Sequence, residues 1–382
     1  MKLLILFLTA GLFSFDITAK SKEEVFILGQ QETETYKIEK FNSSIKPKNI
    51  ILMIGDGMGL NQVEVSRLGI GGVDYKLAID QLPFRGLVTT FSSNNSITDS
   101  AAAATAWATG KKTNNKFLSV SPNKKNIITI TELLAQKGYK NGLVATSSIT
   151  HATPAAFYAH VDNRYKEQKI AKQFLESNID IALGGGAEFF RKLNFSDKYI
   201  LLKSRQDLMA HQNQENKKLL GLFAEDGIMR TDKDMPSQAE MTDLALDYLV
   251  KSTESCNGFF LMSEGSQIDW AGHANNVQYL FAEFNDFDQT VGKLINFINT
   301  DKETLLIITA DHETGGLQLV DKLDNKVKIK WTTKNHTAVP VGIYAYGPGA
   351  ELFSEEMDNT DIFYKMIEVI DCLLYTSDAA DE

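Results

Sequence analysis

Side chains that could do chemistry gather beside the apolar runs of this 382-residue sequence. Several runs that read as strands are followed, or in one case preceded, by Asp, Glu or His. Mixed carboxylate and imidazole ligands suit Zn²⁺ or a similar divalent ion, and their number here exceeds one tetrahedral site. The pattern predicts a two-metal centre, which clamps the attacking and leaving oxygens of a displacement at phosphorus. The residues are Asp56, Glu264, Asp269, His273, Asp311, His312 and His336.

Each of these residues also has an ordinary explanation. Asp56 stands in the glycine-rich turn 55–59, where Asp often serves as a turn former. Asp269 and His273 are spaced like many solvent-exposed helical pairs, and His336 could be a surface histidine. Residues that reach the surface for independent reasons have no cause to concentrate at strand ends. We therefore favour the metal-centre interpretation for the group as a whole.

Ser100 is the candidate nucleophile. It begins the small-residue segment 100–106, a strong helix former, and a helix N-terminus favours a bound anion. The alternative is that Asp99 or Ser100 only caps the helix, a role compatible with catalysis. The sequence lacks a Gly-x-Ser-x-Gly elbow, which disfavours an α/β-hydrolase, and it lacks the Cys-x-Pro-x-Arg motif of sulfatases. Glycines 184–186 lack the Lys-Ser/Thr of a phosphate loop and are better explained as a turn.

Continuous apolar runs predict the strands that must position these residues. Such runs are typical of parallel sheets buried on both faces, and they alternate here with helical patterns. The alternation predicts an α/β fold, a three-layer sandwich with a mostly parallel central sheet and helices on both faces. In such sheets ligands bind at the carboxyl ends of the strands, where the candidate residues fall. The runs are 49–55, 142–146, 180–183, 258–262, 304–309 and 341–345.

Helical periodicity lies between the apolar runs. Ser237 and Glu240 form a candidate capping box ahead of an amphipathic pattern. Apolar positions predict further helices over 127–134 and 281–298. The stretch 190–235 is polar and is interpreted as an excursion on the rim. The sequence shows no internal repeat or long linker, which favours one domain.

Both ends of the chain are set apart from this domain. Residues 1–19 combine Lys2, an apolar stretch too short for a bilayer and a small final residue, as in a secretory signal peptide. We therefore expect a periplasmic or secreted protein without a membrane anchor. Residues 20–46 read as an N-terminal arm and 47–371 as the catalytic domain, whereas 372–382 resembles the translation of a sequencing adapter rather than native sequence.

The composition of the chain limits the kinds of partner that it is expected to bind. Apolar side chains make up 43% and charged ones 23% of the sequence, as in ordinary globular proteins. The formal net charge of −10, without a basic patch, argues against nucleic acid or an anionic membrane as the main partner. An anionic substrate would need local positive charge from a few Arg or Lys or from bound metal. Of the two cysteines, Cys372 lies in the adapter-like tail, which leaves Cys256 without an intrachain partner.

Six segments of the sequence contain the candidate residues: 55–59, 98–102, 151–155 with 159–164, 264–269 with His273, 309–316 and 336–340. Together these segments resemble the metal-dependent alkaline phosphatase family. They occur in the family's order and span residues 49 to about 350, and six in order are far more specific than any one. The resemblance implies an alkaline-phosphatase-like fold, hydrolysis of small phosphate monoesters, and two zinc ions with one magnesium ion as cofactors.

The same resemblance implies a role for each site residue. Ser100 would attack phosphorus and form a phosphoserine, which water then hydrolyses. Arg164 resembles the guanidinium that holds two phosphate oxygens, and Asp99 resembles the carboxylate that orients it. The implied ligands are Asp269, His273 and His336 for the first zinc, Asp56, Asp311, His312 and the Ser100 oxygen for the second, and Asp56, Thr153 and Glu264 for the magnesium ion.

Two positions depart from some relatives. His151 stands where they carry Asp, and Trp270 stands where they carry Lys. His151 is therefore predicted to lie around the magnesium site without being a ligand, which leaves the metal identity there open. Trp270 could shape the phosphate or leaving-group side, or it could simply pack. The short interval from His312 to His336 predicts that the extra surface domain inserted there in some relatives is absent.

Two other functions stay open. A phosphodiesterase or phosphonate hydrolase could use the same fold, although Arg164 favours monoesters because their terminal phosphate carries two charges. A catalytically inactive phosphate- or metal-binding protein is the second alternative, and the presence of Ser100 with a full ligand set argues against it. The sequence also leaves a homodimer open.

Overall fold

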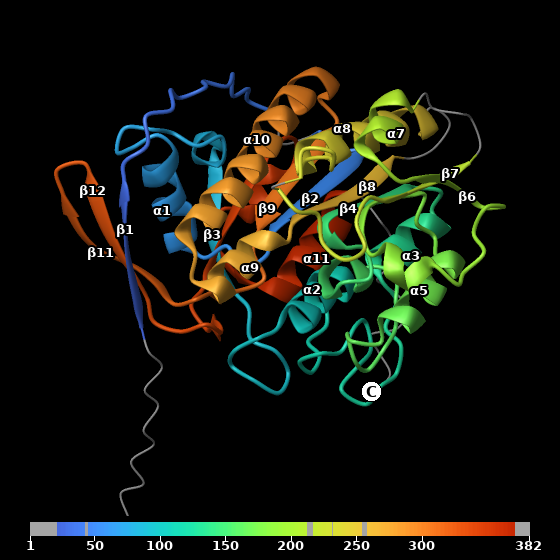
Figure 1. The fold of residues 1–382 in the computed structure, drawn as a ribbon. Coiled ribbons are helices and arrows are strands. Elements are labelled where there is room, and N and C mark those ends of the chain that lie inside the picture. The colour runs from blue at the N-terminus through green and yellow to red at the C-terminus, as the bar shows by residue number, and fades with distance from the viewer. Residues whose placement is uncertain (1–20, 43–44, 212–216, 231, 254–257, 371–382) are drawn as a thin grey trace, which may run out of the picture.

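The computed structural model describes residues 21–42, 45–211, 217–230, 232–253 and 258–370. Within these ranges the chain folds around one large sheet with helices packed against it (Figure 1). The predicted signal peptide, the adapter-like tail and both cysteines lie outside the described residues.

The central sheet comprises ten of the described strands. In order across the sheet they are β15 (Glu356–Asp358), β3 (Phe84–Thr89), β14 (Val341–Tyr346), β9 (Thr304–Thr309), β2 (Asn49–Gly55), β8 (Phe259–Gly265), β4 (Lys140–Ser148), β5 (Ile181–Gly185), β7 (Lys218–Leu222) and β6 (Tyr199–Leu202). Strands β9, β2 and β8 are buried along their whole length, as apolar runs covered on both faces should be. Among these ten, β14 alone runs against the others, because it pairs antiparallel with both β3 and β9. The carboxyl ends of the parallel strands therefore meet at one edge.

Helices cover both faces of the sheet (Figure 1). Helices α1, α8 and α10 pack together on one face, and α2 and α11 pack together on the other. This arrangement confirms the predicted three-layer α/β fold. The described helices are α1 (Leu60–Ile70), α2 (Ser100–Thr109), α3 (Ile130–Gln136), α4 (Ala152–Ala155), α5 (Glu167–Glu176), α6 (Ala187–Phe190), α7 (Arg205–Ala210), α8 (Gln238–Ser252), α9 (Gln267–Ala274), α10 (Val277–Asp301) and α11 (Asn359–Val369), with 3₁₀ turns η1 (Ile79–Gln81) and η2 (Ala350–Phe353).

Two smaller sheets flank the main one. Strand β1 (Lys22–Ile27) pairs antiparallel with β12 (Lys326–Trp331), which pairs with β11 (Leu317–Leu323). The second small sheet joins β10 (Glu313–Thr314) to β13 (His336–Thr337). The arm predicted from the sequence thus contributes a strand to a sheet formed far along the chain. Between His312 and His336 the chain forms the β11–β12 hairpin rather than an inserted domain.

Two local expectations need correction. The stretch 190–235 is more than a rim excursion, because its strands β6 and β7 extend the central sheet in parallel beyond β5. These strands are only four and five residues long, so their sequences give a weak periodic signal. Helix α3 begins at Ile130, since Thr129 caps it in a capping box with Glu132, so Ile127 lies outside the helix. None of the described helices has the length and apolarity that crossing a membrane requires.

The capping box of α8 gives a stability prediction. The Ser237 hydroxyl accepts a hydrogen bond from the Glu240 N–H at 3.0 Å, and the Glu240 carboxylate accepts one from the Ser237 N–H. Ser237→Ala leaves an N-terminal donor of α8 without its partner, so we expect the free energy of unfolding to fall by about 1 kcal/mol. Urea denaturation measures this, with Ser93→Ala as the control because the Ser93 side chain is exposed and caps no helix. Equal losses in both variants would contradict the capping role.

Candidate active site

Three carboxylates meet at the edge of the sheet where β2, β8 and β9 end. Strand β2 lies between β8 and β9 in parallel register, with Ile54 opposite Glu264. Asp56 follows β2 and Asp311 follows β9, and the side chains of Asp56, Glu264 and Asp311 are fully buried. The Gly57 N–H donates to Asp311 Oδ1 at 2.9 Å, which joins the turn after β2 to the end of β9. We call Asp56, Glu264 and Asp311 the carboxylate cluster.

Asp56 and Glu264 are the least compensated members of the carboxylate cluster, because His312 pairs with Asp311. Both carboxylate oxygens of Asp56 and both of Glu264 lack a hydrogen-bond partner among the described residues. Burial, followed by the charge of Asp311, raises the pKa of Asp56 well above its ordinary value. Burial also raises the pKa of Glu264 to about 7. Buried, unpartnered carboxylates are costly unless they are paired or coordinate a metal, so this donor set fits a divalent cation.

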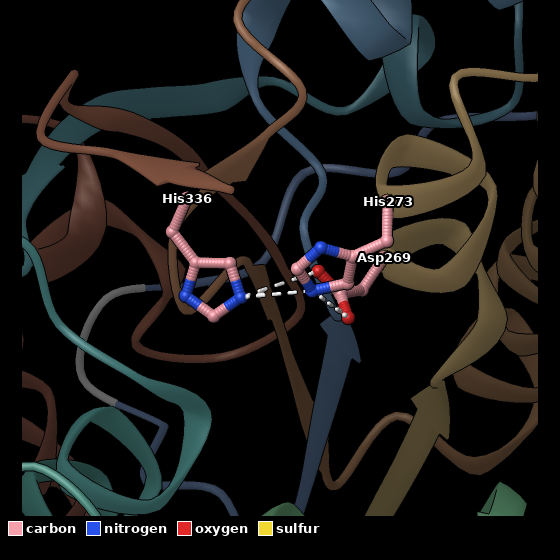
Figure 2. Close-up of side chains that lie close together, drawn as sticks. All are labelled: Asp269, His273 and His336. Atoms are coloured by element: carbon pink, nitrogen blue, oxygen red, sulfur yellow. Dashed lines mark hydrogen bonds and ion pairs between the residues drawn. The ribbon is translucent and has the colours of Figure 1, made fainter. Parts of the chain in front are cut away.

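A second group combines Asp269 and His273, one turn apart on α9, with His336 on β13 (Figure 2). His273 Nε2 lies 3.2 Å from Asp269 Oδ2 and 3.2 Å from His336 Nε2. The Nδ1 atom of each histidine faces a backbone carbonyl. His273 Nδ1 lies 2.5 Å from the Lys334 carbonyl oxygen, and His336 Nδ1 lies 3.0 Å from that of Thr98. With the protons on Nδ1, both Nε2 lone pairs face the same space, as a cation requires. We call Asp269, His273 and His336 the histidine cluster.

His312 connects the two clusters. Its Nε2 lies 2.9 Å from Asp311 Oδ2 and 3.8 Å from Asp56 Oδ1, and its ring stacks on that of His336 with centroids 3.4 Å apart. Ligand atoms of Asp56, Asp269 and His312 all lie within 4.8 Å of one another. Those of Asp56, Glu264 and His151 do the same. The residues thus form three adjoining groups, each able to hold an ion.

The imidazoles differ in charge because their surroundings differ. Burial, together with the neighbouring His312, lowers the pKa of His336 to about 4. Burial and the adjacent Arg164 lower the pKa of His151 to about 3. Both rings are therefore neutral at pH 7, the state in which imidazole binds metal. The hydrogen bond to Asp269 instead raises the pKa of His273 to about 9.

Ser100 lies at the first turn of α2 and faces this centre. Its hydroxyl is buried and lies 3.4 Å from His312 Nε2. Asp99 caps the helix by accepting from the Ala102 N–H at 3.1 Å. Asp99 Oδ2 also accepts a hydrogen bond from Arg164 Nη1 at 3.3 Å, so one carboxylate both caps the helix and contacts the guanidinium. An anion here would meet free helix N–H groups beside a guanidinium.

Arg164, His151 and Trp270 form the side of the site next to Ser100 and the clusters. Arg164 Nη2 lies 3.1 Å from His151 Nε2, and the Trp270 ring meets the His151 ring edge-on with centroids 6.3 Å apart. Gly227 backs Trp270 so closely that a Cβ there would lie 2.5 Å from the indole. Thr153 on α4 is buried, and its hydroxyl, like both carboxylate oxygens of Glu264, has no hydrogen-bond partner among the described residues.

Sequence reasoning missed the groups that hold the histidines. The carbonyls of Thr98 and Lys334 carry no sequence signal, because any residue supplies one. The hydroxyl of Thr314, which contacts both Asp269 and His312, could have been found. It stands two residues after His312, and alternate residues of an extended segment point to the same side.

Comparison with known proteins places this chain in a family. A family model described as "Alkaline phosphatase" matches residues 47–322 and 317–373. The chain belongs to the alkaline phosphatase family. Alkaline phosphatase 3 of Bacillus subtilis (strain 168) is 33% identical over 414 residues, covering 82% of this chain and 87% of the relative. Alkaline phosphatase of Escherichia coli (strain K12) is 32% identical over 411 residues, covering 85% and 86%.

A solved structure supports the same placement. The alkaline phosphatase of the Antarctic bacterium TAB5 is 36% identical, with a TM-score of 0.77 over 86% of this chain and 98% of that one. The predicted family and fold are thereby confirmed. The chain is an alkaline phosphatase that hydrolyses phosphate monoesters. Metal cofactors suit both the family and the unpartnered carboxylates of the site.

Proposed function

We propose that this enzyme hydrolyses small phosphate monoesters through a phosphoserine intermediate on Ser100, assisted by two zinc ions and one magnesium ion. The observation that carries the proposal is the position of the Ser100 hydroxyl. It lies at a helix N-terminus, 3.4 Å from His312 Nε2, beside buried carboxylates without partners. This position supports the proposal, because the serine oxygen lies beside groups that could bind an anion and a cation.

The donor chemistry of the three groups supports the metal assignment. The histidine cluster offers nitrogen and oxygen donors, which suit zinc. His312 adds a nitrogen to the carboxylates of the second group, which also suits zinc. The third group is rich in oxygen, which suits magnesium. The proposed ligands are Asp269, His273 and His336 for the first zinc, Asp56, Asp311, His312 and Ser100 for the second, and Asp56, Thr153 and Glu264 for the magnesium ion.

His151 makes the third metal position distinctive. Its ring nitrogen lies among the oxygens of Asp56 and Glu264, within reach of the same ion. A histidine-to-aspartate variant of the TAB5 enzyme has magnesium bound in its M3 site. Because magnesium prefers an all-oxygen shell, we propose that His151 weakens magnesium binding in this chain.

The chain's own groups then account for the chemistry. Bound cations would lower the pKa of a coordinated hydroxyl and stabilise charge on the leaving oxygen. Ser100 Oγ attacks phosphorus in line with the leaving group and becomes the phosphoserine, which water then hydrolyses. Arg164 holds two non-bridging phosphate oxygens through its planar guanidinium, and Asp99 keeps that guanidinium in place. The N–H groups of the first turn of α2 add to the stabilisation of the phosphate charge.

We also propose that the mature enzyme acts outside the cytoplasm. The support is the signal-like composition of residues 1–19. A homodimer stays a prediction.

Relative turnover of two model substrates tests the proposed function. We expect p-nitrophenyl phosphate to be hydrolysed with at least about tenfold higher kcat/KM than bis-p-nitrophenyl phosphate, because Arg164 needs two free oxygens on the terminal phosphate. Steady-state kinetics on the metal-loaded enzyme measures the ratio. Arg164→Lys serves as the control, because a lysine keeps the charge but loses the two-pronged contact, so the preference should shrink. A higher kcat/KM on the diester would favour a phosphodiesterase instead.

A further inference from the structure

The hydroxyl of Thr314 lies between the ligand groups of the two proposed zinc ions. Thr314 Oγ1 donates to Asp269 Oδ1 at 2.5 Å and lies 3.2 Å from His312 Nδ1. The side chain is fully buried, so water does not compete for these contacts. One hydroxyl therefore touches the carboxylate of the histidine cluster and the imidazole that connects it to the carboxylate cluster.

The backbone around Thr314 holds this hydroxyl in place. In the β10–β13 pair, Thr314 is directly opposite His336, another imidazole of the centre. The Thr314 carbonyl accepts a hydrogen bond from Gln62 Nε2 at 2.7 Å. Two glycines pack against it, since a Cβ on Gly57 would lie 2.9 Å from Thr314 Oγ1 and one on Gly272 would lie 2.8 Å from Thr314 Cγ2. The threonine thus has little freedom to turn away.

Counting protons fixes the direction of both hydrogen bonds. A hydroxyl has one proton, and an ionised carboxylate, the form that binds metal, can only accept. The proton of Thr314 therefore goes to Asp269, and its oxygen accepts from His312 Nδ1–H. A neutral His312 with its proton on Nδ1 presents the lone pair of Nε2, the atom 2.9 Å from Asp311 Oδ2 and 3.4 Å from the Ser100 hydroxyl. With zinc bound, His312 Nε2 and Asp311 Oδ2 would both donate lone pairs to the ion.

We propose that Thr314 is a positioning residue of the metal centre, which fixes the tautomer of His312 and the orientation of Asp269 through one hydroxyl. The inference rests on the proposed function, because it takes the two clusters as zinc sites. Its consequence is that the two sites share a support. Loss of that hydroxyl weakens zinc binding at both positions.

The test uses zinc affinity, which a purely structural threonine would leave unchanged. Thr314→Val keeps the shape but removes the hydroxyl, and we expect zinc affinity to fall about 10–100-fold when the full-length enzyme competes with a zinc indicator. Thr314→Ser restores the hydroxyl, so its affinity should return to within a few-fold of wild type. The matched control is Thr290→Val on α10, since the Thr290 side chain is also buried and donates only to the Asp286 carbonyl of its own helix. It should bind zinc as wild type does.

Three results would overturn the proposal. Thr314→Val could bind zinc as tightly as wild type, Thr314→Ser could be as weak as Thr314→Val, or Thr290→Val could lose affinity equally. The outcome is separable from the proposed function, because zinc binding is measured without substrate. A wild-type enzyme inactive on monoesters, with weakened zinc binding in Thr314→Val, would reject the function and support the role of Thr314.

Discussion

Ser100→Ala is expected to abolish phosphoenzyme formation and to lower turnover of p-nitrophenyl phosphate by about 10³-fold or more. The variant removes the oxygen that attacks phosphorus and leaves the helix intact, because Asp99 supplies the cap of α2. The other proposed ligands are unchanged, so the metal content should stay near that of the wild type. Rapid acid quenching after mixing with ³²P-labelled substrate measures the phosphoenzyme, and elemental analysis measures the metals.

Ser66→Ala is the matched control for this prediction. Ser66 is also a fully buried helical serine, and its hydroxyl has no hydrogen-bond partner among the described residues. Its removal should leave turnover within about twofold of wild type. Labelled protein in Ser100→Ala, or turnover equal to that of Ser66→Ala, would show that another group is the nucleophile.

The centre of the fold could be predicted from sequence because its strands are unambiguous. The apolar runs of β2, β8 and β9 become three neighbouring strands buried on both faces, so local composition and tertiary environment agree. The capping box at Ser237 likewise depends on residues three apart. Such features are local, and a sequence shows them directly.

Pairing between distant segments could not be predicted in the same way. Strand β14 is as apolar as its neighbours, yet it runs antiparallel to them, and direction leaves no mark on composition. Strand β1 pairs with β12, about 300 residues away, through backbone groups that every residue carries. The short strands β6 and β7 become recognisable as strands once β7 pairs with β5 and β6 pairs with β7.

In the candidate site, too, the residue types could be predicted from the sequence, whereas the contacts between distant segments could not. Residues such as Asp311 and His312 could be recognised as candidate ligands from their type and from their position after a predicted strand. Their mutual distances depend on how parallel ends align, which the register of β2 with β8 and β9 supplies. His151 shows the limit of sequence reasoning, because its contact with Arg164 and its closeness to Asp56 arise from separate loops. The sequence showed which residue stands there and left its partners open.

Chelation is expected to remove nearly all activity and to destabilise the fold. EDTA should lower turnover of p-nitrophenyl phosphate by at least about 100-fold, and Zn²⁺ with Mg²⁺ should restore it. A ligand that binds only the native state, at a free concentration about 1,000 times its Kd, adds about 4 kcal/mol to the free energy of unfolding. Removing the metals takes this contribution away, so the melting temperature should fall by several degrees. Elemental analysis before and after treatment relates both losses to metal content. Full activity in protein stripped of metal would reject the metal centre.

The destabilisation should also depend on pH in a definite direction. Without cations, burial raises the pKa of Asp56 well above its ordinary value and that of Glu264 to about 7, so the folded apoenzyme binds protons that the unfolded chain releases. Stability from such groups is greatest below their unfolded pKa, near 4, and is lost as the pH rises toward 7. The difference in melting temperature between metal-loaded and stripped enzyme should therefore widen from pH 5 to pH 8. A constant difference across that range would mean that the cations do not neutralise these carboxylates.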